Sequence, residues 1–234
     1  MQISQNNGRR RAIRSFVRRN GRLTPSQQRA LVELMPDFGL EFHPEPLDFD
    51  EIFESLHPTT LEIGFGNGDT LIEQAGRNPG MNFLGIDVHE PGVGRCLLQA
   101  RDANLNNLRL IVHDAIEVLE HQIPRQSLAR VNLYFPDPWP KKRHRKRRIV
   151  QSAFVDLIAN RLVAGGTFNI ATDWENYAEH IDEVMSRSNL FECTDRREHD
   201  GDRPLDRSRT RFEQRGVQKG HRIYDWCFRK APNS

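Results

Sequence analysis

The chain has 234 residues, 37% of them hydrophobic, which suffices for one large domain with a core. It contains no run of 18 apolar residues, the length needed to span a membrane. Three widely spaced cysteines without a C-x-x-C pair argue against a disulfide framework or a zinc site and favour a reducing cytoplasm. The net charge of +2 conceals two basic blocks without acids, residues 9–22 and 141–148, which hold 14 of the 34 Lys and Arg and predict a polyanionic partner rather than two merely solvated segments.

The first 58 residues divide into an arm and a lead-in. Residues 1–22 are polar and rich in arginine, which predicts a basic, flexible arm without the apolar stretch of a secretory signal. Residues 23–58 form the lead-in. Thr24-Pro25-Ser26-Gln27 has the pattern of a capping box with proline at the first helical position, and predicts a short helix over about 24–35. The prolines of residues 36–58 predict a linker, with at most a short helix near Phe49–Leu56.

Strand-like and helix-like segments alternate in the remaining domain, residues 59–230. The predicted strands are Thr59–Ile63, Asn82–Val88, Leu108–Val112, Arg130–Phe135 and Thr167–Ala171, and the predicted helices are residues 69–77, 90–104, 115–121, 147–162 and 174–188. This alternation predicts an α/β fold with a parallel sheet and helices on both faces. Leu190–Arg197 and Arg222–Phe228 are strands joined by a polar segment without a predicted helix, so the sheet should end in an antiparallel pair. A Rossmann-like methyltransferase fold fits this pattern better than a dinucleotide dehydrogenase.

A glycine-rich loop follows the first strand of this domain. Gly64, Gly66 and Gly68 lie between a strand and a helix, where glycine permits positive φ and close approach of a ligand. Their G-x-G-x-G spacing differs from the G-x-G-x-x-G that seats a pyrophosphate. Glu62, just before them, suits a ligand with a positive charge. These features favour S-adenosylmethionine, which carries a sulfonium and an ammonium and no phosphate.

Acids also end the next two strands. Asp87 could accept hydrogen bonds from two ribose hydroxyls, and Asp114 could accept from an adenine amino group. Either acid alone could simply cap the following helix. Three acids at the carboxyl ends of successive strands, beside a glycine loop, favour a ligand, because open α/β sheets bind ligands there.

The fourth strand ends in a proline-rich loop. Pro136 and Pro138 flank Asp137 and stiffen the loop, which sets the direction of the carboxylate. A purely structural turn would not explain why the run from Lys142 to Arg148 is so basic.

Together these motifs resemble the bacterial tRNA (guanine-N7)-methyltransferases. The resemblance covers roughly residues 20–230 and rests on LEIGFGNG at 61–68, GIDVHEPGVG at 85–94, FPDPWPKKRHRKRR at 135–148, ATDWENYAEH at 171–180 and TRFEQRG at 210–216. It implies a class I methyltransferase that transfers the methyl group of S-adenosylmethionine to N7 of the guanine at position 46 in the tRNA variable loop. The product would be S-adenosylhomocysteine. The sequence shows no metal cluster and no sign of an obligate protein partner.

The resemblance also implies roles for individual residues. Cofactor contacts are expected at Glu62, Asp87, Asp114 and Asp137, together with Gly64, Gly66 and Gly68, and Asp137 is the expected catalytic residue. Substrate contacts are expected at Lys141, Asp173, Thr210, Arg211, Phe212 and Glu213. RNA contacts are expected at Arg143, His144, Arg145, Lys146, Arg147 and Arg148.

The chemistry fits these residues. Guanine N7 has an in-plane lone pair and no proton, so the enzyme mainly has to orient it. A carboxylate can stabilise the positive charge that moves onto the base, and Asp137 or Asp173 could read the two adjacent donors of guanine. Thr172 and Glu175 should form a capping box that leaves Asp173 free. Phe212 and Trp139 could stack on a base or fill the core.

Three alternatives remain at this level. An exocyclic-amino methyltransferase for RNA or DNA is disfavoured because such enzymes carry D-P-P-Y, whereas Trp139 follows Pro138 directly here. An RNA-binding chaperone with an inactive fold is disfavoured by the intact acids. A dehydrogenase is disfavoured by the glycine spacing and by Glu62.

Overall fold

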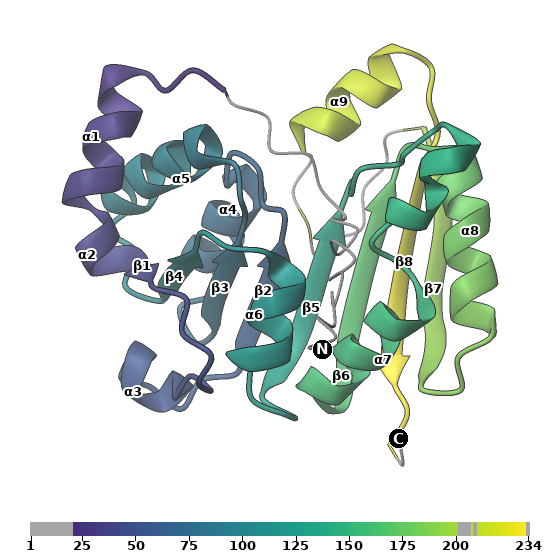
Figure 1. The fold of residues 1–234 in the computed structure, drawn as a ribbon, viewed down its shortest axis with the longest axis horizontal. Coiled ribbons are helices and arrows are strands. Elements are labelled where there is room, and N and C mark those ends of the chain that lie inside the picture. The colour runs from purple at the N-terminus through teal and green to yellow at the C-terminus, as the bar shows by residue number, and fades with distance from the viewer. Residues whose placement is uncertain (1–20, 201–206, 208–209, 233–234) are drawn as a thin grey trace, which may run out of the picture.

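An eight-stranded sheet forms the centre of the molecule (Figure 1), with strand order β1-β4-β3-β2-β5-β6-β8-β7. The computed structural model describes residues 21–200, 207 and 210–232, so the predicted basic arm lies almost entirely outside it. The strands are β1 (Gly39–Leu40), β2 (Thr59–Ile63), β3 (Asn82–Ile86), β4 (Leu108–Ile111), β5 (Leu128–Tyr134), β6 (Leu162–Thr172), β7 (Phe191–His199) and β8 (Ile223–Lys230). β1 to β6 pair in parallel, and β8 is antiparallel to both β6 and β7. The predicted fold class is therefore confirmed.

Helices pack on both faces of this sheet and create two hydrophobic clusters. The helices are α1 (Pro25–Glu33), α2 (Met35–Phe38), α3 (Phe49–Phe53), α4 (Asp69–Arg77), α5 (Glu90–Asp102), α6 (Ala115–His121), α7 (Ser152–Arg161), α8 (Glu175–Ser186) and α9 (Arg211–Gln218), with a 3₁₀ helix, η1 (Lys142–Arg147). Successive strand residues point to opposite faces, so Phe83 packs with α1, α4 and α5 whereas Leu84 packs with α3, α6, α7 and α8. None of the helices in the described ranges is long and apolar enough to cross a bilayer.

The lead-in packs onto the sheet domain through α1. Thr24 and Gln27 form the predicted capping box. The Gln27 side chain also donates to the Pro91 carbonyl at 3.0 Å, and Ala30 is buried in the cluster beneath α5. Helix α1 therefore packs against α5 of the sheet domain.

Several local predictions differ from the structure. The polar segment between the last two strands contains helix α9, which was not predicted. The helix expected over 147–162 begins only at Ser152, because η1 occupies the basic run before it. The predicted capping box at Thr172 was wrong: Trp174 is the N-cap of α8, and the Thr172 hydroxyl accepts from the Trp174 N–H at 3.3 Å.

Candidate functional site

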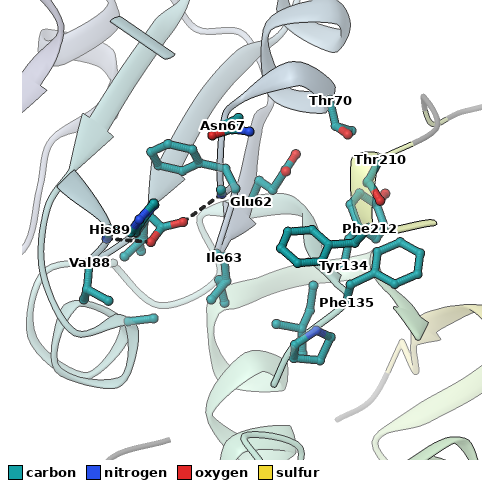
Figure 2. A pocket seen from close by; sticks show the side chains of 18 of the residues that line it. Glu62, Ile63, Asn67, Thr70, Val88, His89, Tyr134, Phe135, Thr210 and Phe212 are labelled. Atoms are coloured by element: carbon teal, nitrogen blue, oxygen red, sulfur yellow. Dashed lines mark hydrogen bonds between the residues drawn. The ribbon is translucent and has the colours of Figure 1, made fainter. Parts of the chain in front are cut away.

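A cavity of ≈ 350 Å³ opens at the carboxyl ends of β2, β3 and β5, where the glycine loop, the Pro-Asp-Pro loop and α9 converge. This is the usual place for a ligand in an open α/β sheet. In Figure 2, Val88 and His89 lie on one side of the cavity, the rings of Tyr134, Phe135 and Phe212 gather on the other, and Glu62 lies between them. The cavity thus has a polar end near β3 and an aromatic end near β5 and α9.

The glycine loop exposes backbone to this cavity at two positions. Gly64 and Gly66 have φ of 72° and 59°, and a Cβ at either position would meet nothing within 4 Å. Gly68 differs, because a Cβ there would collide with Cys96 of α5. Gly64 and Gly66 therefore leave room for a ligand, whereas Gly68 allows α4 and α5 to pack closely.

Asp87 ties the glycine loop to the end of β3. One carboxylate oxygen accepts the Gly66 N–H at 2.7 Å and the other accepts the His89 N–H at 2.8 Å. Burial raises the pKa of Asp87, and these backbone donors oppose that rise. Asp87 thus organises the loop and also lines the cavity.

Asp114 has a different position. Its carboxylate accepts the Ile116 N–H at 2.9 Å and caps α6, and it does not line the cavity. Its neighbour His113 does line the cavity and stacks on Phe42, with ring centroids 3.9 Å apart. No sequence motif pointed to His113, apart from its place beside a strand end.

Glu62 is a buried acid with unused hydrogen-bonding capacity. Glu62 is only 3% exposed, and its Oε2 atom has no hydrogen-bond partner among the described residues. Burial raises the pKa of Glu62 to about 8, nearby Asp87 adds to the rise, and Arg207 opposes it. An unpartnered carboxylate oxygen at the bottom of a cavity is suited to a cationic ligand. These residues therefore fit S-adenosylmethionine.

We expect a Glu62→Gln variant to become progressively more stable than the wild type as the pH rises from 6 to 8. The unfolded chain ionises Glu62 near its ordinary pKa of 4.5, whereas the folded chain holds the proton up to about 8. This group's contribution to stability is thus complete below pH 4.5 and is lost as the pH rises through 8. The wild type loses up to about 1.4 kcal/mol of unfolding free energy per pH unit in this window.

Urea denaturation of both proteins at pH 6, 7 and 8 measures this difference. Glutamine keeps the size of the side chain and cannot ionise, so the variant lacks the effect. An unfolding free-energy difference that stays constant over the three pH values would contradict the burial of an ionisable Glu62.

The acceptor end of the cavity is built around a constrained loop. Phe135 and Trp139 both have left-handed backbone conformations, with φ of 52° and 44°, and enclose Pro136, Asp137 and Pro138. Asp137 lines the cavity together with Thr210 and Phe212 of the α9 segment. Phe212 is 57% exposed, which leaves an aromatic face uncovered at the rim.

A buried charge cluster supports this end of the cavity. Arg207 donates to both oxygens of Asp225 at 2.9 and 2.8 Å and to Glu213 at 2.6 Å, and its guanidinium lies over the rings of Tyr134 and Phe135. Burial alone would lower the pKa of Arg207, but its hydrogen bonds to the carboxylates of Asp225 and Glu213 raise that pKa above its ordinary value. No sequence motif pointed to Arg207, although the Thr-x-x-Glu pattern at 210–213 indicates that a helix begins nearby.

The cavity brings together seven of the predicted site residues: Glu62, Gly64, Gly66, Asp87, Asp137, Thr210 and Phe212. Five other residues predicted to contact the cofactor or the substrate lie outside its lining: Gly68, Asp114, Lys141, Asp173 and Glu213. Asp173 faces His221, with an oxygen 3.3 Å from Nδ1, and Glu213 is fully buried against Arg207. Lys141 is exposed at the start of η1. The side chain of Arg211 lies outside the described residues.

The residues of the predicted RNA-contacting segment differ in their exposure. Arg143 and Lys146 are exposed, and His144, Arg145 and Arg147 are half-buried. Arg148 is only 2% exposed and donates hydrogen bonds into the protein. The prediction of Arg148 as an RNA contact therefore disagrees with its position, because a side chain buried under other residues presents no surface to a phosphate.

Comparison with known proteins gives consistent results along the chain. Residues 56–226 match a family model described as "Putative methyltransferase". The chain is 55% identical to the tRNA (guanine-N(7)-)-methyltransferase of Aeromonas hydrophila over 221 residues, which are 94% of this chain and 93% of the relative. It is 51% identical to the protein of the same name from Yersinia enterocolitica, over 98% of this chain and 96% of that relative.

Solved structures resemble the fold at much lower identity. The 16S rRNA methyltransferase KamB gives a TM-score of 0.59 at 14% identity, covering 80% of this chain and 95% of that one. A 16S rRNA (adenine(1408)-N(1))-methyltransferase from Catenulisporales acidiphilia, solved with its cosubstrate S-adenosylmethionine, gives 0.54 at 14% identity and covers 80% and 94%. These similarities identify the class I methyltransferase fold.

Proposed function

The chain belongs to the tRNA (guanine-N(7)-)-methyltransferase family, and from this membership we propose that it methylates N7 of the guanine at position 46 in the variable loop of cytoplasmic tRNA. One observation carries the assignment of the site. One cavity holds both the unpartnered buried acid Glu62 and Asp137, which lies on a constrained loop next to an exposed basic segment.

The polar end of the cavity suits the cofactor. When bound, S-adenosylmethionine supplies a methyl group on a positively charged sulfur. Glu62 offers a carboxylate oxygen to a cation, and Gly64 and Gly66 leave room beside the backbone. Asp87 holds this loop in place and offers its carboxylate to the ribose.

The aromatic end suits a guanine. Its N7 lone pair needs no base before it attacks, so the contribution of the protein is orientation. Asp137 can accept hydrogen bonds from guanine, and its negative charge opposes the positive charge that develops on the base. The exposed ring of Phe212 offers a stacking surface, worth about 1–3 kcal/mol per base in nucleic-acid complexes.

The basic segment beside this loop should bind tRNA phosphates. We expect the triple variant Arg143→Gln, Arg145→Gln, Arg147→Gln to raise the tRNA KM and flatten the salt dependence of binding. Each lost phosphate contact reduces the slope of log K against log[salt] by about 0.7–0.9, so the full change is roughly 2 to 3. Binding titrations between 50 and 200 mM salt measure it.

Two controls accompany this test. S-adenosylmethionine binding should be unchanged in the triple variant, and Arg187→Gln, which removes an exposed ion pair with Glu183 in α8, should leave the salt slope as in the wild type. A triple variant with the wild-type slope would show that these three arginines do not bind the phosphates.

The direct test of the function is methyl transfer to bulk unmodified tRNA, with the modified nucleoside identified by mass spectrometry. N7-methylguanosine is expected, and it should disappear when the guanine at position 46 is replaced. An N-methylated exocyclic amine would support the alternative amino methyltransferase. Binding of tRNA without binding of S-adenosylmethionine would support an RNA chaperone.

A further inference from the structure

Arg148 is the most deeply buried member of the basic run at 141–148. The residue is 2% exposed, and its guanidinium donates three hydrogen bonds to neutral acceptors. Nε donates to the Pro138 carbonyl at 2.9 Å. Nη1 donates to the Asn176 carbonyl at 3.1 Å, and Nη2 donates to Asn176 Oδ1 at 3.0 Å. The guanidinium carbon lies 4.7 Å from the centre of the Tyr177 ring.

These bonds connect two distant parts of the chain. Pro138 follows Asp137 in the constrained loop, whereas Asn176 lies in the first turn of α8. Helix α8 is firmly packed, with Tyr177 and Ile181 fully buried in the core. The planar fork of an arginine can bond both partners at once, which a lysine ammonium on a flexible stem does not reproduce. Arg148 therefore fastens the loop to a rigid helix.

The loop needs such a fastening because its conformation is unfavourable. The left-handed φ values of Phe135 and Trp139 are unfavourable for residues other than glycine, and such conformations persist only where the surroundings enforce them. The first end of the loop is held by the Phe135 N–H, which donates to the Ala171 carbonyl of β6 at 2.8 Å. The second end is held by the bond from Arg148 to Pro138. Asp137 lies between these two anchors.

We propose that Arg148 is a positioning residue that sets the direction of the Asp137 carboxylate from beneath the loop, and that it does not contact RNA. This proposal rests on the proposed function, in which Asp137 orients the guanine. Two basic residues of the same segment would then have different roles. Arg143 is exposed and can bind phosphates, whereas Arg148 is buried and bonds to the loop.

The test compares Arg148→Gln and Arg148→Lys with the matched exposed control Arg143→Gln. We expect both Arg148 variants to lower the single-turnover methylation rate at saturating tRNA and cofactor by about 10²-fold, the usual cost of a small misplacement of a reacting group. The tRNA KM and the salt slope should stay within about twofold of the wild type, as the phosphate contacts are intact. Arg143→Gln should show the reverse pattern. Lysine should not rescue position 148, although it would serve as a phosphate contact.

Hydrogen–deuterium exchange tests the loop without relying on activity. Prolines at 136, 138 and 140 leave the amides of Asp137, Trp139 and Lys141 as reporters, and their exchange should accelerate in the Arg148 variants and not in Arg143→Gln. Asn176→Ala removes only one acceptor and should produce a smaller change of the same kind if the Arg148 variants fold poorly.

Three results would overturn the proposal. Full activity of Arg148→Lys combined with a raised tRNA KM for Arg148→Gln would make Arg148 an RNA contact. A lower melting temperature with an unchanged methylation rate per folded molecule would make it a purely structural residue. Unchanged hydrogen–deuterium exchange of the loop amides would show that Arg148 does not hold the loop. This result is independent of activity, so it would stand even if the wild type failed to methylate tRNA and the proposed function were wrong.

Discussion

The Asp137→Asn variant is expected to methylate tRNA about 10²–10³ times more slowly than the wild type, which corresponds to roughly 3–4 kcal/mol of transition-state stabilisation. Asparagine keeps the shape of the side chain but replaces one acceptor oxygen with a donor group, which would face a donor of the guanine or of the cofactor. It also removes the negative charge at the moment when the base becomes cationic. Asp137 lines the cavity on a loop held at both ends, so this loss is not relieved by movement.

Single-turnover methylation at saturating cofactor and tRNA is the measurement, since binding defects are then suppressed. The melting temperature should remain close to that of the wild type, because the residue is only partly buried and contributes little to the core. Asp156→Asn, which changes an exposed acid on α7, is the matched control and should keep the full rate. A near-wild-type rate for Asp137→Asn would remove Asp137 from the catalytic role.

The architecture of the sheet could be predicted because it depends on local patterns. Three of the five residues of Thr59–Ile63 are β-branched, and the segments 69–77 and 115–121 coincide with α4 and α6. Helix α9 was missed because its eight residues are mostly polar, although the capping box of Thr210 and Glu213 marks its first turn. The buried ion pair of Glu213 with Arg207 also stabilises this first turn, and the sequence pattern does not reveal that contact.

The site was predictable only in part, for a related reason. Gly64 and Gly66 were identified from backbone freedom, and Asp87 from its position at a strand end. Arg148 looked the same as its neighbours in a run of eight residues, because charge patterns do not indicate which side chain turns inward. Its burial is decided by acceptors that lie 10 and 28 residues away in the sequence, at Pro138 and Asn176.

The second large effect is expected at Arg207, where an Arg207→Met variant should be destabilised by about 3–5 kcal/mol. Methionine leaves Asp225 and Glu213 as two buried carboxylates, 8% and 0% exposed at the side chain, without their cation. His199, 2.6 Å from Asp225, can compensate one of them only when it is protonated. The charge of Arg207 also acts on Glu62, because it opposes the rise in the pKa of that carboxyl.

For a chain of this length the loss corresponds to a fall of roughly 6–20 °C in melting temperature. The decisive comparison is the triple variant Arg207→Met, Asp225→Asn, Glu213→Gln, which removes the unpaired charges and should recover much of the lost stability. Arg187→Gln breaks an ion pair whose side chains are 71% and 57% exposed, so it should change the stability by less than about 1 kcal/mol. If Arg207→Met melted like Arg187→Gln, the charge cluster would contribute no more than a surface ion pair, and the α9 segment that places Thr210 and Phe212 at the cavity would have to be held by its other contacts.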